Sequence, residues 1–374
     1  MDEVFRASDK YINKRCGLHI EEYQKNIDGC MCVDKKTKCA KHKHITKEEY
    51  LQIVSKIINE FLENGFDKVI ERYHPKYDNI KLYNSLKEKK VSIKKITAQV
   101  CSDSNKIIKA AMYKHFYNVK DFKGINYKSL WNREILEKAF NKKLSATKFK
   151  PDIPKGQGET IFTNIFEILK RIKHTRVTIY SPLMTKCILK ELECKTVFDP
   201  CIGWGGRMVG TCSIEGEYIG CEPYTATYNS LKDIIKELNL KNVTIYNCPV
   251  ENKLEELSNK RFDCCLTSPP YYNLEVYCDE DSQSINKYNT YEDWLDKFIE
   301  PIIKYVTTYC DKYSCWSVKN FKTDKQYNLY DDIVNLHKKY GWEYETEYFI
   351  KKNNKTEKKA IGDVTYIFKN PKLQ

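Results

Sequence analysis

Residues 267–272 (TSPPYY) bring together hydroxyl groups, two prolines and two aromatic rings. They follow the apolar run 262–266, which predicts a β-strand, and open α/β sheets bind ligands at the carboxyl ends of such strands. Because proline lacks an N–H, the carbonyls of this turn and the Ser268 oxygen can accept hydrogen bonds from an amino group. Tyr271 could stack on the planar ring that carries this amino group. A strand that simply ends in a proline-rich turn accounts for the same residues.

A glycine-rich segment lies upstream, at residues 197–207 (VFDPCIGWGGR), and predicts a strand, a turn and the start of a helix. Gly203 and Gly205 would let the backbone approach a ligand closely, and unpaired amides at the helix start would face that ligand. The next predicted strand, 217–221, precedes Glu222, which is twenty-three positions after Asp199. A carboxylate at this spacing accepts hydrogen bonds from ribose hydroxyls in nucleotide-binding sheets. A plain strand-turn-helix corner is the alternative.

Together these residues resemble the class I methyltransferases that use S-adenosylmethionine, in particular the DNA amino-methyltransferases that modify N4 of cytosine or N6 of adenine. The resemblance covers roughly residues 155–374. The catalytic residues that it implies are Ser268, Pro269, Pro270 and Tyr271. The cofactor-binding residues that it implies are Asp199, Pro200, Gly203 and Gly205 for the methionine part and Glu222 for the ribose, with Tyr180 and Ser181 in a flanking motif.

The resemblance also implies direct methyl transfer without a covalent intermediate. Ser268 and the Pro269 carbonyl would accept hydrogen bonds from the amine and turn its lone pair toward the sulfonium methyl group. Tyr271 would stack on a base that is flipped out of the duplex. Serine at the first motif position is commoner among the N4-cytosine enzymes, so cytosine is slightly favoured over adenine. A catalytic cysteine is disfavoured, because neither Cys201 nor Cys248 lies at the end of the catalytic strand.

The elements that must position these residues fit the α/β fold of the class I methyltransferases, a Rossmann-like, mostly parallel sheet of seven strands. Further strands are expected at 243–246, 314–318, 342–350 and 364–368, and helices at 224–238, 291–308 and 329–339. The last two strands resemble the terminal antiparallel pair of the methyltransferase sheet. Residues 150–158 (KPDIPKGQG) predict a boundary, so the expected domains are 1–150 and 151–374.

Positive charge is concentrated in the first of these domains. The chain has a formal net charge of +13; residues 1–150 hold 33 Lys and Arg against 19 Asp and Glu, and the remainder holds 31 against 32. Such an excess indicates a phosphate-binding region, so DNA is the expected partner. A lysine-rich composition that only solubilises a helical domain is the alternative.

Residues 91–116 within this basic, mainly helical region fit a helix-turn-helix, with the turn at 101–103 and a helix cap at Ser104. The side chains expected to enter the major groove are Asn105, Lys106, Lys109, Lys114 and His115. Cys101 replaces the usual turn glycine, and a plain pair of packed helices remains the alternative. The region 1–150 is therefore expected to recognise the DNA target.

Four residues near the N-terminus, Cys16, His19, Cys39 and His42, have the spacing of zinc ligands but match no standard finger. Since the chain holds sixteen cysteines, frequent cysteine usage explains them equally simply. The sequence shows no N-terminal signal segment and no run of about eighteen apolar residues. With so many cysteines, we expect a reducing compartment, either the cytoplasm or the DNA compartment of a host.

The main hypothesis is a site-specific DNA methyltransferase, of viral or phage type, with or without a restriction partner. RNA or protein amine methylation is the nearest rival, because related Pro-Pro-aromatic motifs serve guanine N2 and glutamine side chains. Those relatives more often carry Asn or Asp at the position of Ser268. A non-catalytic DNA-binding protein with a degenerate methyltransferase fold is the third reading, and the presence of both motifs disfavours it.

Overall fold

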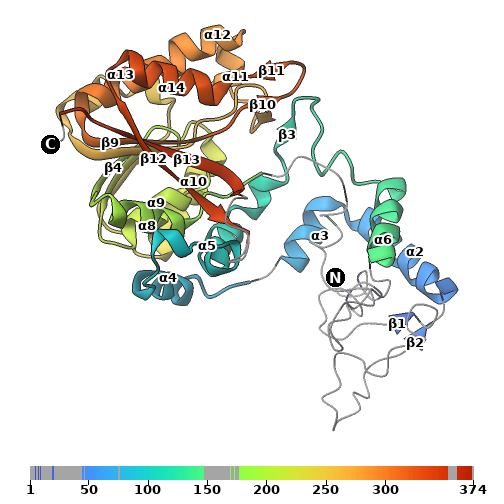
Figure 1. The fold of residues 1–374 in the computed structure, drawn as a ribbon. Helices are drawn as coiled ribbons and strands as arrows, with labels where there is room; N and C mark the ends of the chain where they lie inside the picture. Colours follow the sequence, from blue (N-terminus) through green and yellow to red (C-terminus); the bar gives the residue numbers. More distant parts are fainter. Residues whose placement is uncertain are drawn as a thin grey trace. The chain divides into compact units, whose positions relative to one another are not determined.

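The computed structural model describes residues 47–74, 76–146, 177–352 and 360–372, with isolated residues at 5, 7, 9, 19–20, 44–45, 169 and 172. The chain divides into two compact units (Figure 1). The smaller unit comprises residues 1–74 and 125–175, and the larger comprises residues 75–124 and 176–374.

One seven-stranded sheet, with the strand order β12-β13-β9-β7-β4-β5-β6, forms the centre of the larger unit. The strands are β4 (Thr196–Asp199), β5 (Glu217–Cys221), β6 (Val243–Tyr246), β7 (Phe262–Thr267), β9 (Cys310–Val318), β12 (Glu343–Lys351) and β13 (Ala360–Lys369). β13 runs antiparallel to both of its neighbours, and the other central pairs are parallel. The predicted Rossmann-like, mostly parallel sheet with a terminal antiparallel pair is confirmed.

Apolar side chains on both faces of this sheet are covered by helices, as expected for buried parallel strands. Val197 of β4 belongs to a core with α8 (Pro182–Glu191), α9 (Gly206–Cys212) and α10 (Thr225–Glu237). Its neighbour Phe198 belongs to a second core with α13 (Glu300–Tyr309) and α14 (Leu329–Lys339). Figure 1 shows α13 and α14 on one side of the sheet and α8 and α9 on the other.

The connections of this unit contain shorter elements. They are β3 (Lys120–Asp121), β8 (Glu275–Val276), β10 (Phe321–Lys322), β11 (Gln326–Tyr327), α11 (Ser284–Lys287), α12 (Tyr291–Trp294) and the single turns η4 (Val250–Asn252), η5 (Glu256–Asn259) and η6 (Leu295–Ile299). The predicted helix 291–308 is formed by α12, a π-helical turn and α13 in succession.

Residues 75–124 belong to the unit of the sheet, whereas the boundary predicted near residue 150 grouped them with the N-terminal region. This segment forms α4 (Asn79–Glu88), the 3-10 turn η3 (Ile93–Lys95) and α5 (Ala98–Phe116). α5 packs against α4, α8 and α10, and its apolar side chains are part of the core on that face of the sheet.

The predicted helix-turn-helix at 91–116 is wrong, because α5 continues without a break through the expected turn at 101–103. Thr97 caps this helix by accepting a hydrogen bond from the Val100 N–H at 3.3 Å, and α5 contains no glycine or proline that would interrupt it. Ser104 does not cap a second helix. Its hydroxyl donates to the Cys101 carbonyl at 2.9 Å, one turn back in the same helix.

The side chains expected to enter a major groove therefore lie along one continuous helix. Asn105 and Lys106 are half-buried, and Lys106 forms an ion pair with Asp103 at 2.7 Å. Lys109 and Lys114 are exposed. His115 is half-buried, and its Nε2 forms a hydrogen bond with the Ser230 hydroxyl at 2.8 Å. Contacts of these side chains with DNA remain a prediction.

The described part of the smaller unit is mainly helical. It contains α2 (Lys47–Asn64), α3 (Phe66–Tyr73), α6 (Arg133–Ala146) and the short parallel strands β1 (His19–Ile20) and β2 (His44–Ile45). The Tyr50 hydroxyl donates to the Phe140 carbonyl at 3.3 Å and joins α2 to α6.

Several predictions for the smaller unit fall outside the described residues. These are the zinc candidates Cys16, Cys39 and His42, the side chain of His19, and the boundary segment 150–158. Among the helices that the structure describes, none combines the length and apolar character needed to cross a bilayer.

Candidate functional site

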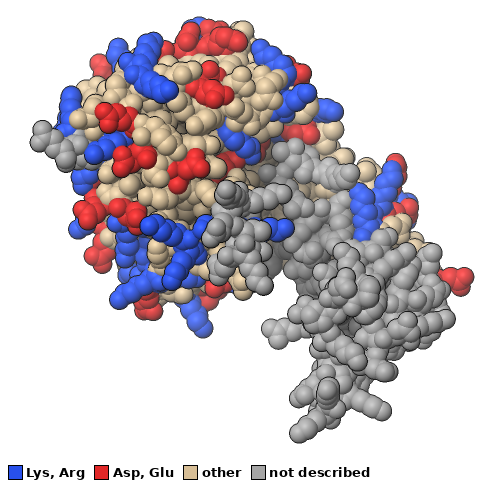
Figure 2. Space-filling model, in the orientation of Figure 1, with Lys and Arg blue, Asp and Glu red and all other residues tan. Residues whose placement is uncertain are grey.

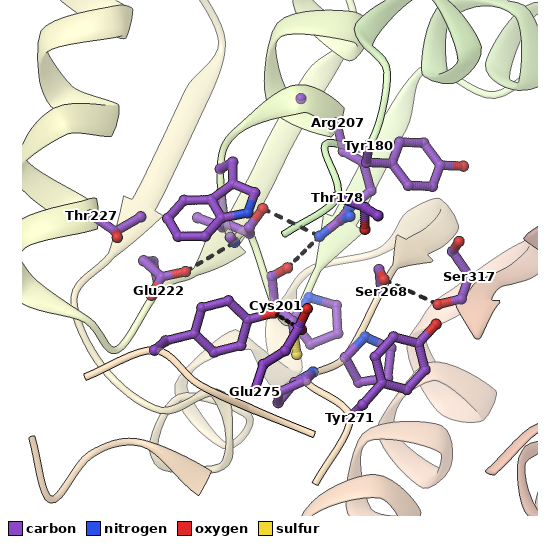
Figure 3. Close-up of a pocket in the computed structure, with 18 of the residues that line it drawn as sticks. Thr178, Tyr180, Cys201, Arg207, Glu222, Thr227, Ser268, Tyr271, Glu275 and Ser317 are labelled. Atoms are coloured by element: carbon purple, nitrogen blue, oxygen red, sulfur yellow. Dashed lines mark hydrogen bonds between the residues drawn. The ribbon is translucent and has the colours of Figure 1, made fainter. Parts of the chain in front are cut away.

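A pocket opens at the carboxyl ends of β4, β5 and β7 (Figure 3). β4 has β5 on one side and β7 on the other, so the direction of strand addition reverses beside it. Open α/β sheets bind ligands at such a switch point. Nine of the eleven residues predicted for catalysis and cofactor binding line this pocket: Tyr180, Ser181, Pro200, Gly203, Glu222, Ser268, Pro269, Pro270 and Tyr271.

The glycine-rich turn after β4 depends on backbone geometry and close packing. Gly203 and Gly205 have positive φ angles of 57° and 81°, which favour glycine. A Cβ atom at Gly205 would approach Leu231 Cδ2 to 2.6 Å, and one at Gly206 would lie 1.9 Å from the Tyr180 carbonyl oxygen. Gly205 does not line the pocket but shapes the turn, and its predicted role in cofactor binding remains a prediction.

Asp199 lies beneath this turn, and its carboxylate already accepts five hydrogen bonds. One oxygen accepts from Arg207 Nε at 2.7 Å and the Tyr218 hydroxyl at 2.6 Å. The other accepts from the Thr267 hydroxyl at 3.1 Å, the Cys201 N–H at 3.2 Å and Arg207 Nη2 at 3.3 Å. Asp199 is 0 % exposed and Arg207 4 % exposed. The pair ties β4 to β5, β7 and α9, and the predicted contact of Asp199 with the methionine part of a cofactor remains a prediction.

Glu222 follows β5 and presents a buried carboxylate to the pocket. It is 7 % exposed and accepts hydrogen bonds from the N–H groups of Gly203 and Tyr224, both at 2.9 Å. Burial raises the pKa of Glu222 to about 8. The carboxylate has further lone pairs beyond these two bonds, so it can also accept from the hydroxyl groups of a ligand.

Ser268 follows β7 and has its proton engaged by the protein. Its hydroxyl donates to the Ser317 carbonyl, at the end of β9, over 3.0 Å (Figure 3). The Ser268 oxygen is thereby left with its lone pairs, so it can act toward a ligand as an acceptor. This is the role that the sequence predicts for it.

Tyr271 forms an aromatic wall of the pocket beside Ser268. The ring is buried and makes an edge contact with Phe321 at a centroid distance of 5.5 Å. Burial raises the pKa of the Tyr271 hydroxyl, and the carboxylate of Asp363 acts in the same direction. Tyr271 is therefore neutral at physiological pH. The next turn of the chain is tight, since Tyr272 has a positive φ of 35°.

Several residues that line the pocket were not predicted from the sequence. Glu275 is buried, accepts a hydrogen bond from the Tyr277 hydroxyl at 2.5 Å, and has its pKa raised by burial. Asp363 of β13 forms an ion pair with Lys319 at 2.7 Å. Trp204, between the two glycines, contacts Phe116 of α5 and Tyr277. Of these residues, only Trp204 could have been found from the local sequence, because it lies inside the glycine-rich turn. Asp363 lines the pocket because of the strand order, and Glu275 because of the path of a loop.

The two ends of the pocket suit different ligand groups. In Figure 3, Glu222 lies on one side and Ser268, Ser317 and Tyr271 lie on the other, with Glu275 between them in this view. The Glu222 side offers a buried acceptor for hydroxyl groups. The Ser268 side offers an acceptor oxygen, proline carbonyls and a ring, which suit a planar group with an amine. Among the described residues, no group of three or more His, Cys, Asp or Glu is placed to hold a metal ion.

Comparisons with known proteins identify no family for the chain: no family model matches it, and neither does any curated protein sequence. Three of the solved structures that it resembles are methyltransferases. Precorrin-6y C5,15-methyltransferase from Geobacter metallireducens is 13 % identical, with a TM-score of 0.35, over 51 % of this chain and 88 % of that one. Magnesium protoporphyrin IX methyltransferase from Synechocystis, solved with bound SAM, is 11 % identical, with a TM-score of 0.35, over 50 % and 79 %.

The third, a SAM-dependent methyltransferase from Agrobacterium tumefaciens, is 9 % identical, with a TM-score of 0.37, over 52 % of this chain and 64 % of that one. Similarities this low say nothing about the activity or the substrate of this chain. The strand order and the residues at the strand ends remain the basis for assigning a function.

Proposed function

We propose that this protein is an S-adenosylmethionine-dependent DNA methyltransferase that modifies the exocyclic amino group of a flipped base. One observation carries the proposal: a single pocket at the switch point joins the buried carboxylate of Glu222 to the Ser268-Pro269-Pro270-Tyr271 turn. The first would hold the ribose of the cofactor, and the second would hold the methyl acceptor.

The pocket offers groups that would hold the cofactor. Glu222 accepts hydrogen bonds from ribose hydroxyls, while Tyr180, Ser181, Pro200 and Gly203 surround the rest of the molecule. S-adenosylmethionine, when bound, supplies a methyl group activated by its sulfonium.

The acceptor side orients the amine. Ser268 and the Pro269 carbonyl accept hydrogen bonds from the amino hydrogens, and Tyr271 stacks on the base, so that the nitrogen lone pair points at the methyl carbon. Methyl transfer to this nitrogen would release the cofactor as its thioether, and the proton given up by the methylated amine would pass to solvent. Serine at position 268 slightly favours N4 of cytosine over N6 of adenine.

Lysines in residues 75–124 of the larger unit support DNA as the substrate. Residues 75–124 hold twelve Lys against four Asp and Glu. Figure 2 shows Lys and Arg gathered where Figure 1 places α4 and α5. The exposed lysines Lys87, Lys90, Lys94 and Lys95 define a surface, which we call the lysine surface.

The backbone that follows Lys94 and Lys95 is joined to a strand that lines the pocket. The Lys351 N–H donates to the Ile96 carbonyl at 3.1 Å, directly after Lys94 and Lys95, and Ile350 lines the pocket. Phosphates that flank a base in the pocket would therefore lie within reach of these lysines. This surface takes the place of the helix-turn-helix as the proposed contact with DNA.

The proposal is tested by offering labelled S-adenosylmethionine and the purified protein a mixture of unmethylated DNA, RNA and protein extract. We expect label in DNA, and about a hundredfold slower labelling with Ser268→Ala. Label in RNA or protein, with DNA unlabelled, would establish the rival amine methyltransferase instead. Calorimetry without detectable S-adenosylmethionine binding would favour a non-catalytic DNA-binding protein.

A further inference from the structure

Phe122 is an apolar side chain that the fold leaves in solvent. It is 42 % exposed and follows β3, in the connection after α5. Three other large apolar side chains in the described residues are exposed, namely Leu51 and Ile80 on helices and Tyr344 on a strand. Phe122 differs from them because it lies at the tip of a turn.

This turn, Asp121 to Gly124, is well ordered by its own hydrogen bonds. The Gly124 N–H donates to the Asp121 carbonyl at 2.8 Å, and the Lys123 N–H donates to the Asp121 side chain at 2.9 Å. Gly124 has a positive φ of 75°, and glycine is favoured at the fourth position of such turns. The two central residues, Phe122 and Lys123, are both exposed. The turn thus presents an aromatic ring and a positive charge on a defined backbone.

The turn is attached to the wall of the pocket. β3 pairs antiparallel with β8, and Asp121, the residue before Phe122, lies opposite Glu275. Glu275 lines the pocket on the loop after the Ser268-Pro269-Pro270-Tyr271 turn. An ion pair between Lys120 and Asp279 at 2.9 Å joins the same two segments. Phe122 is therefore held beside the site that would receive the flipped base.

We propose that Phe122 is the wedge that enters the DNA base stack when the target base moves into the pocket, an inference that rests on the proposed function. Removing a base from a duplex leaves a gap and costs stacking energy, and apolar or aromatic side chains of DNA-bending and single-strand-binding proteins compensate by stacking on bases. Lys123, whose Nζ lies 5.5 Å from the centre of the Phe122 ring, is placed to contact a neighbouring phosphate.

The inference is tested by comparing methyl transfer to duplex DNA and to the same DNA after strand separation. A single-stranded base needs no extrusion, so Phe122→Ala should lower kcat/KM on duplex by at least about fivefold and change it less than about twofold on single strands. Phe122→Trp should retain the duplex activity. Ile80→Ala, which removes a more exposed apolar side chain of α4, is the matched control and should change neither.

Each other outcome contradicts the inference. Equal activity of Phe122→Ala and wild type on duplex would refute the wedge and leave the proposed function intact. An equal loss on both substrates, with an unchanged unfolding temperature, would assign Phe122 to strand binding in general. A wild-type protein that methylates neither DNA form would overturn the proposed function and the wedge with it.

Discussion

Glu222 gives a prediction whose sign and size depend on its surroundings. Its carboxylate is 7 % exposed and accepts two backbone N–H bonds at 2.9 Å, and burial raises its pKa to about 8. Below this pH the free protein carries a proton on Glu222. Ribose hydroxyls that donate to the carboxylate favour the charged form, so cofactor binding must release that proton.

The linkage sets the pH profile of S-adenosylmethionine affinity. The affinity should rise by about tenfold per pH unit as the pH increases toward 8, and level off above it. Glu222→Gln removes the titration and, since an amide oxygen replaces one carboxylate oxygen and an NH2 the other, leaves one backbone N–H unpaired. That unpaired donor lowers the stability of the fold, whereas the affinity changes because the ribose hydroxyls lose a charged acceptor. A hydrogen bond to a charged group contributes about 1.5–3 kcal/mol, so the affinity at high pH should fall roughly tenfold to a hundredfold.

Titration calorimetry at about pH 6, 7, 8 and 9, in two buffers of different ionisation enthalpy, measures both the affinity and the proton release. The α-amino group of the cofactor titrates near 7.7–8.0 as well, and Glu222→Gln is the control that retains this titration. The difference in S-adenosylmethionine affinity between wild type and Glu222→Gln should become smaller as the pH falls. A difference in affinity that stays constant across these pH values would refute the assignment of Glu222 to the ribose.

Four further predictions concern the pocket and its frame. Ser268→Ala should lower turnover about a hundredfold with the S-adenosylmethionine Kd unchanged, and a parallel loss of cofactor affinity would contradict its acceptor role. Asp199→Asn leaves the buried Arg207 without its counterion and should cost about 3–5 kcal/mol in urea unfolding, whereas Asp311→Asn, in an exposed pair with Arg261, should cost less than about 1 kcal/mol. Gly206→Ala should lower the unfolding temperature more than Gly203→Ala, because a Cβ atom at position 206 would clash with the Tyr180 carbonyl whereas one at position 203 would face open space. A larger loss with Gly203→Ala would contradict this account of the packing. Lys94→Glu with Lys95→Glu should weaken DNA binding and flatten its salt dependence, while Lys338→Glu on α14 should do neither; equal effects would remove the lysine surface from the DNA contact.

Much of the sheet is determined by local sequence. The strands at 217–221 and 243–246 and the helix at 329–339 have the predicted bounds, because short apolar runs between turn residues and a helical spacing define them. Residues placed directly after such strands, including Glu222 and Ser268, then meet at one edge of a parallel sheet. For these residues, their positions directly after predicted strands were enough to predict that they share one site.

The α5 region shows where local signals mislead. Ser102, Asp103 and Ser104 have the residue types of a turn and a helix cap, yet they continue a helix that starts at the cap Thr97. The competing influence is tertiary: Cys101 and Ile108 are fully buried in the core of the sheet unit. Composition marked the segment 150–158, but it could not show that residues 75–124 pack on α8 and α10.

Pocket residues from distant elements were equally invisible in the sequence. Asp363 reaches the pocket because β13 lies beside β9, and Glu275 because β8 pairs with β3. Both positions depend on pairings between segments far apart in the chain. Phe122 belongs to the same class, since only the pairing of β3 shows that its turn borders the pocket.

The most direct test of the central claim is mass spectrometry of nucleosides from the DNA of cells that express the protein. The proposed function predicts N4-methyl-2′-deoxycytidine, or N6-methyl-2′-deoxyadenosine, in cells with the wild-type chain and much less of it in cells with Ser268→Ala. Unmodified DNA in cells that contain folded, S-adenosylmethionine-binding wild-type protein would contradict it.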